Sequence, residues 1–359
     1  MVQTPTGAGK QKGISNLAQA EERTAWWLLL PSLIVLVAIA IYPLGRVFYS
    51  SFTNERFASP GHRTEYVGFS NYLTLLTLTI RAIPYEIDPA TGERIYQNPR
   101  LFLRRLDTPR PFDQVRTFEL FGTRYVLGAT NARFVNAVID TLVFTVANVT
   151  FTTLLGLIVA LTLATKFFGR NAMRTAMLVP WAIITVVSAL IWEWMFKSNR
   201  SGFFNALFDH LNWADGNIGF LTEPLLQLPS VIIMDVWKTT PFMALLLLAG
   251  LSTIPNELYE AAEVDGASKI KRFFSITLPL LMPTLAVALV FRTLDALKVF
   301  DLFQVVFGER RYSMASFAQD MLISNRDVGL SSAASVVIFL AIFIFAIFYI
   351  RLLGVERNA

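Results

Sequence analysis

Four charged residues lie inside otherwise apolar stretches of the sequence. Asp235 and Lys238 are three residues apart in one stretch, and Arg292 and Asp295 have the same spacing in another. Side chains three residues apart share one face of a helix, so each pair can neutralise itself. Alternatively, these groups line a polar path, where they offer hydrogen bonds to a hydroxyl-rich molecule. Charges in apolar surroundings are costly, so each interpretation gives them a role.

No other set of residues has a spacing that supports catalysis or the binding of a metal or a nucleotide. The sequence lacks a nucleophile–base pair, an HExxH motif and a complete phosphate-binding loop, because Gly9 and Lys10 have neither the first glycine nor the following hydroxyl residue. It contains no cysteine, and its two histidines, His62 and His210, are far apart. We therefore expect no catalytic residue, no metal site, no cofactor and no ATPase site in this chain.

The composition indicates a membrane protein. Of 359 residues, 54% are hydrophobic and 16% are charged, which is outside the range of soluble globular proteins. The net charge of +5 is typical of basic cytoplasmic ends in such a protein and does not indicate nucleic-acid binding.

Apolar windows of about 20 residues, charge-free except in the fourth and fifth, predict six transmembrane helices. The first lies within residues 25–52, and the others lie near 141–165, 175–192, 228–251, 276–299 and 328–350. The expected fold class is an all-α membrane protein. A polar tail (1–24) precedes the first helix, a five-helix core spans 134–354, and a short end (355–359) follows.

Residues 53–133 are polar and contain six scattered prolines. This segment is too long for a simple loop, so we expect it to fold as a small insert outside the membrane. Within it, Phe118–Leu127 is predicted to form a β-hairpin centred on Gly122 and Thr123.

A short basic loop determines the predicted orientation. Lys166, Arg170 and Arg174 lie between the second and third spans with no acid among them. Short basic loops stay in the cytoplasm, so the insert is expected outside and both termini inside. Tryptophans then gather near the outer face, where an aromatic belt explains most of them and sugar stacking is the alternative for one or two. The candidate path residues are Trp192, Trp237, Lys238, Arg292 and Asp295.

Residues 256–283 form the most polar and most patterned segment of the C-terminal half. Pro255 precedes a stretch with acids where a helix dipole favours them, and Gly266 is a natural left-handed stop. Ser268 can cap a second helix that leads into an apolar run. We therefore predict two short helices with a break between them.

This segment resembles the EAA loop of the membrane subunits of binding-protein-dependent ABC importers. The matching residues are Glu260, Ala261, Ala262, Asp265, Gly266, Ile276, Leu278 and Pro279. Residues 66–72 before the insert and 134–142 after it are similar to the corresponding segments of sugar-type permeases. An ordinary amphipathic connector between two spans is the alternative.

The resemblance implies a cytoplasmic coupling helix that docks into an ATPase. The implied partners are an ATP-binding cassette ATPase dimer, a second permease subunit that completes a heterodimer, an extracytoplasmic solute-binding protein and the lipid bilayer. The implied location is the cytoplasmic (inner) membrane of a bacterium or archaeon. A neutral di- or oligosaccharide is the expected cargo, with glycerol-3-phosphate or another polyol as the alternative.

Two further classes of protein fit less well. A membrane-embedded glycosyl transferase needs acidic or metal-binding residues at the end of a span, and none cluster there. An ion-coupled secondary transporter predicts inverted repeats with broken helices, and no duplication is visible in the sequence.

Overall fold

A computed structural model describes residues 16–352, and the chain divides into two compact units, 1–49 and 50–359. The first unit is a helical run made of α1 (Asn16–Leu36), the π-helical η1 (Val37–Ile41) and α2 (Tyr42–Ser50). Its segment Glu21–Ser50 is apolar enough to cross a membrane. The helix begins at Asn16, earlier than the span expected from residue 25. Residues 1–15 of the expected tail (1–24) and the expected end (355–359) lie outside the described residues.

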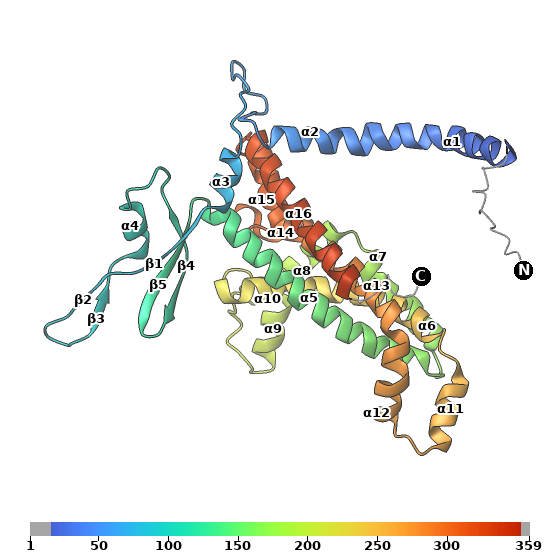
Figure 1. Cartoon of the computed structure of the whole chain (residues 1–359). Helices are drawn as coiled ribbons and strands as arrows, with labels where there is room; N and C mark the ends of the chain where they lie inside the picture. The colour runs from blue at the N-terminus through green and yellow to red at the C-terminus, as the bar shows by residue number, and fades with distance from the viewer. Residues whose placement is uncertain (1–15, 353–359) are drawn as a thin grey trace, which may run out of the picture. The chain divides into compact units, whose positions relative to one another are not determined.

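The second unit combines a helical bundle with a strand-rich insert (Figure 1). Its longest helices are α5 (Ala132–Ala164), α10 (Pro224–Leu251), α13 (Leu278–Leu297) and α16 (Val328–Leu352). Shorter helices between them are α6 (Arg170–Ala176), α7 (Leu178–Ala182), α8 (Thr185–Met195), α9 (Phe203–His210), α11 (Asn256–Val264), α12 (Lys269–Arg272), the π-helical η2 (Phe273–Thr277), α14 (Asp301–Phe307), the 3-10 helix η3 (Gly308–Arg310) and α15 (Met314–Ile323).

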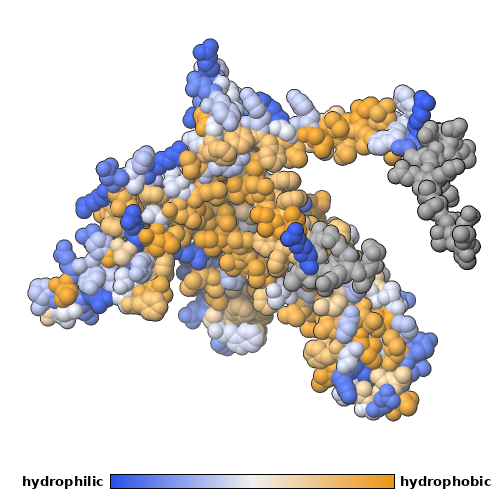
Figure 2. Space-filling view, viewed as in Figure 1, coloured by the Kyte–Doolittle hydropathy of each residue, from blue (hydrophilic) through white to orange (hydrophobic). Residues whose placement is uncertain are grey.

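Within residues 16–352, five helical segments are long and apolar enough to cross a membrane, and a bent pair raises the number to six. The chain is therefore a mostly helical protein with five or six candidate spans. Figure 2 shows apolar residues over the helical bundle of the second unit, whereas polar residues gather on the insert. This distribution is that of a bundle surrounded by lipid.

The expectation of one continuous third helix over residues 175–192 is wrong. The segment is broken into α6, α7 and α8, and the axes of Arg170–Ala182 and Thr185–Met195 differ by 91°. Pro180 has no N–H to continue the helix from α6. The β-branched pair Ile183 and Ile184 then adopts extended backbone angles, which separates α7 from α8.

The insert is built on an antiparallel sheet. Its elements are α3 (Ser70–Leu76), β1 (Leu78–Ala82), β2 (Tyr85–Ile87), β3 (Arg94–Tyr96), α4 (Pro99–Arg104), β4 (Asp113–Leu120) and β5 (Thr123–Ala129). The strands form a three-stranded sheet of order β1-β5-β4 and a separate β2-β3 hairpin. A small core of Ile83, Leu103, Phe112 and Val126 holds α4 against the sheet.

The predicted hairpin over 118–127 is confirmed, although its turn is one residue earlier than expected. β4 pairs with β5 from Leu120 opposite Thr123. The two turn residues, Phe121 and Gly122, have φ values of +50° and +73°. Two positive φ values are the requirement of the type I′ turn that suits a twisted hairpin.

Close packing of α5 against α10 forms the centre of the bundle. Gly156 of α5 permits this approach, because a Cβ built there would lie 2.7 Å from Met243 Cγ and 3.2 Å from the backbone nitrogen of Ala244. Around it, Leu163, Leu247 and other apolar side chains are fully buried. These helices therefore form a rigid frame for the polar groups that they carry.

Candidate functional site

A buried arginine connects three helices of the bundle. Arg292 of α13 donates from Nη2 to Asp235 Oδ2 of α10 and to Asn148 Oδ1 of α5. Its Nη1 donates to Asp295 Oδ2 at 2.5 Å, and Asn148 Nδ2 donates to Asp235 Oδ2 at 2.8 Å. Thr152 Oγ1 adds a hydrogen bond to Asn148 Oδ1 at 3.0 Å. The arginine side chain is only 5% exposed, so the network neutralises a charge inside the bundle.

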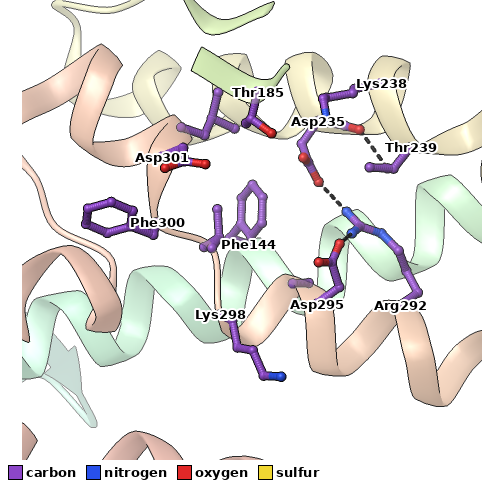
Figure 3. Close-up of a pocket in the computed structure, with 13 residues that line it drawn as sticks. Phe144, Thr185, Asp235, Lys238, Thr239, Arg292, Asp295, Lys298, Phe300 and Asp301 are labelled. Atoms are coloured by element: carbon purple, nitrogen blue, oxygen red, sulfur yellow. Dashed lines mark hydrogen bonds and ion pairs between the residues drawn. The ribbon is translucent and has the colours of Figure 1, made fainter. Parts of the chain in front are cut away.

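The structure corrects one of the two predicted pairs. Arg292 and Asp295 form an ion pair within α13, as their spacing predicts. Asp235 does not pair with Lys238, because its carboxylate faces Arg292 of the neighbouring helix (Figure 3). No ion pair of Lys238 is found within the described part of the chain. Pairing between helices therefore replaces pairing within α10.

A polar cavity of about 190 Å³ lies beside this network. Its lining contains three acids and three bases, which are Asp235, Asp295, Asp301, Lys238, Arg292 and Lys298. Thr185 and Thr239 add hydroxyl groups, and Phe144 and Phe300 add aromatic rings (Figure 3). Arg292 Nε is buried and has no hydrogen-bond partner in the described structure. The cavity can thus offer donors and acceptors to a polar molecule at no net charge.

The two candidate tryptophans do not line this cavity. Trp192 is 7% exposed and packs in the main apolar core against Phe196 and Trp237. Both tryptophans line a separate apolar hollow with residues of α5 and α10. The structure thus brings Lys238, Arg292 and Asp295 together and leaves Trp192 and Trp237 on another side of α10.

Two members of the polar interior were missed in the sequence. Asn148 lies in the apolar run of α5, where a lone amide was itself a signal. Asp140 is buried nearer the start of α5, just before the charge-free window that begins at Thr141. Arg311 binds the Asp140 carboxylate with two donors, at 2.6 and 2.7 Å, and also donates to Gln227 of α10 at 3.1 Å. This second pair holds the segment after η3 against α5 and α10.

The segment 256–283 contains two helices with a sharp break, as its pattern predicts. α11 ends at a glycine whose φ is +74°. The N–H of Gly266 donates to Glu263 O at 3.0 Å, and the N–H of Ala267 donates to Ala262 O at 2.9 Å. These two bonds define a Schellman motif, which requires a left-handed residue and so favours glycine. Ser268 then caps α12 through the N–H of Lys271.

The pair α11–α12 is held together at its base and exposed along its length. Arg272 contacts Glu263 at 3.0 Å, and Tyr259 OH lies 3.0 Å from Thr277 Oγ1. No residue of α11 is buried, and apolar side chains are left in the open: Val264 is 89% exposed and Ile270 is 73% exposed. Exposed apolar residues on a rigid, polar-rimmed projection are typical of a protein-binding surface.

The geometry predicts unequal roles for the two charged residues of α10. Asp235→Ala should lower the free energy of unfolding by about 1.5–3 kcal/mol, because it leaves Arg292 with an unsatisfied donor. Lys238→Ala is the matched control and should cost less, since Lys238 has no ion pair to lose. A double-mutant cycle with Arg292→Ala in detergent measures the coupling, expected at roughly 0.5–3 kcal/mol. Equal losses for Asp235→Ala and Lys238→Ala would contradict this reading.

Comparisons with known proteins agree with these features. Residues 152–354 match the family of binding-protein-dependent transport system inner membrane components. The chain is 33% identical over 338 residues to a trehalose transport system permease of Mycobacterium tuberculosis, covering 93% of this chain and 90% of that protein. It is 42% identical over 242 residues to a trehalose/maltose transport system permease of Thermococcus litoralis, covering 66% of this chain and 81% of that protein.

A solved structure shares the fold. The match is to a bacterial ABC transporter involved in the import of the acidic polysaccharide alginate, with a TM-score of 0.69 and 20% sequence identity, and it covers 96% of this chain and 100% of that chain. The whole-length relative and the family match point to one conclusion. This chain belongs to the family of binding-protein-dependent transport system inner membrane components.

Proposed function

We propose that the chain is the permease subunit of an ATP-binding cassette importer and forms half of the pathway for a di- or oligosaccharide. The proposal rests on the order of the helices along the chain. Asp235 lies on α10 and Arg292 on α13, and the exposed pair α11–α12 is the segment that joins these two helices. A force applied to α11–α12 is therefore applied to both walls of the polar cavity.

The motif residues suit a docking and transmission role. Glu260, Ala261, Asp265, Gly266 and Pro279 are exposed, whereas Ala262, Ile276 and Leu278 are half-buried at the base of the pair. The small residues allow close approach of a partner, and the exposed acids can meet basic groups on it. The partner is a dimer of ABC ATPases. Its two clefts need two such loops and this chain has one, so a second permease subunit completes the pore.

The cavity supports a neutral, hydroxyl-rich cargo. Its three acids balance its three bases, so it does not concentrate positive charge for a phosphate. Lys238, Arg292 and Asp295 are the proposed path residues; Trp192 and Trp237 are candidates for the adjoining wall only. Permeases for trehalose and maltose among the relatives favour a sugar. Glycerol-3-phosphate or another polyol is the second candidate, and a solute-binding protein delivers the cargo from outside.

The proposed topology follows from the basic loop between α5 and α6. Lys166 lies between α5 and α6, Arg170 and Arg174 lie in α6, and this acid-free basic segment supports a cytoplasmic position. The segment α11–α12 then lies on the cytoplasmic side as well, together with both termini. The insert lies on the external face of the inner membrane, where it can meet a solute-binding protein.

The topology can be tested with single cysteines, because the native chain has none. Thr91→Cys in the insert and Lys166→Cys in the basic loop are both at exposed positions. In intact cells, a membrane-impermeant thiol reagent should label the first and spare the second, and permeabilised cells should label both. If only Lys166→Cys is labelled in intact cells, the orientation is the opposite of the one proposed.

The coupling role can be tested by changing the break between α11 and α12. Gly266→Leu should abolish substrate-stimulated ATP hydrolysis in the assembled importer while the complex still forms. A left-handed leucine costs roughly 1–2 kcal/mol in backbone strain, and its bulk projects into open space that a partner must fill. Glu260→Lys should have a similar effect, because it reverses the charge at one position of the docking helix, where an acid can meet a basic group of the partner.

Gly61→Leu is the matched control for the strain. Gly61 is in the segment before the insert sheet, has φ of +84°, and likewise has open space where a side chain would be added. This variant should keep stimulated ATPase activity at the wild-type level. ATPase rates with and without the binding protein are compared at equal amounts of assembled complex. Normal stimulation in Gly266→Leu and Glu260→Lys would show that this loop does not transmit the signal.

A further inference from the structure

Three cations lie close together after the end of α5. Lys166, Arg170 and Arg174 form no ion pair within the described residues, and no acid occurs anywhere between Asp140 and Glu193. The Nε atoms of Arg170 and Arg174 are buried without a hydrogen-bond partner. A buried guanidinium donor without an acceptor is costly, so this group is incomplete as it stands.

Lys166 and Arg170 line an open hollow of about 440 Å³, and Arg174 lies outside its lining, one turn after Arg170 in α6. Its lining runs continuously along the chain from Lys166 to Ala172 and includes Phe167 and Phe168. The ring of Phe168 is fully exposed, although an apolar side chain gains nothing from contact with water. The hollow follows directly after α5, which is 33 residues long and apolar enough to span a membrane. Cations and bare aromatic rings therefore lie together at the end of a span.

We propose that this hollow binds the headgroup of an anionic phospholipid of the phosphatidylglycerol type. The phosphate oxygens accept hydrogen bonds from Arg170, whose planar guanidinium group suits phosphate geometry, and Arg174, one turn along α6, adds positive charge beside it. Lys166 adds a third charge at the rim. The rings of Phe167 and Phe168 then lie in the boundary between headgroups and acyl chains, where aromatic residues are favoured. Basic pockets beside transmembrane helices recognise anionic lipids through this combination.

The lipid is favoured over a protein partner by the aromatic residues and by position. The hollow follows the end of the apolar helix α5, so a headgroup bound in it would lie next to the acyl chains around that helix. The proposed ATPase surface, α11–α12, contains both acids and bases, whereas this loop has bases alone. Both segments lie at the same end of the bundle (Figure 1). The inference rests on the proposed topology and adds a lipid ligand to it.

Native mass spectrometry of the complete importer tests the proposal. The complex is extracted from membranes, delipidated and titrated with phosphatidylglycerol or phosphatidylcholine. Wild type should bind phosphatidylglycerol selectively. In the Arg170→Gln/Arg174→Gln variant the affinity for it should fall roughly 30-fold, about 2 kcal/mol, since each basic residue near the membrane surface contributes about 1 kcal/mol. Binding of phosphatidylcholine should not change.

Arg100→Gln/Arg105→Gln is the control, because it removes two charges from exposed positions in the insert, away from the proposed ATPase surface. It should leave phosphatidylglycerol binding as in wild type. Three results would overturn the proposal: unchanged binding in the arginine variant, displacement of the lipid by inorganic phosphate, or loss of the lipid whenever the ATPase is bound. Lipid binding is measured without transport. Absence of lipid binding would therefore not contradict the proposed importer function, and absence of transport would not change the interpretation of the lipid measurement.

Discussion

The position of one arginine constrains the rest of the bundle. Arg292 is buried among apolar helices, where an uncompensated charge costs several kcal/mol. Its charge is balanced by Asp235 of α10 and Asp295 of its own helix, and Asn148 of α5 accepts a hydrogen bond from it, which fixes the register of α5 and α10 against α13. Close approach of α5 and α10 at Gly156 makes the arrangement sterically feasible. The polar network and the apolar packing are therefore two parts of one constraint.

The same network connects the exposed segment α11–α12 to the polar cavity. α10 and α13 are joined only by α11, α12 and η2 in sequence, and the Arg272–Glu263 and Tyr259–Thr277 contacts stiffen that connection. An exposed projection that is rigid at its base can move as a unit. Because its two ends continue into the helices that carry Asp235 and Arg292, we expect such movement to alter the contact between these two side chains.

Much of this arrangement could be predicted from the sequence, and the misses have physical causes. The break at Gly266 and the hairpin near Gly122 were predictable because each depends on local backbone preference. The partner of Asp235 was not, because the choice between Lys238 and Arg292 depends on how two distant helices pack. A kink near Pro180 could be predicted from the sequence, but the 91° bend also depends on the backbone angles of Ile183 and Ile184, which hydropathy does not measure. Trp192 illustrates the same limit, since its type suits stacking on a sugar while its packing buries it in the core.

The central claim is that the contact between Asp235 and Arg292 responds to the state of α11–α12. The most direct test is to determine the structure of the assembled importer in two states, nucleotide-free and trapped with ATP and the binding protein. The account predicts that α11–α12 moves between these states and that the carboxylate of Asp235 separates from the guanidinium of Arg292 as the cavity opens. Movement of α11–α12 with the contact and the cavity unchanged would contradict it.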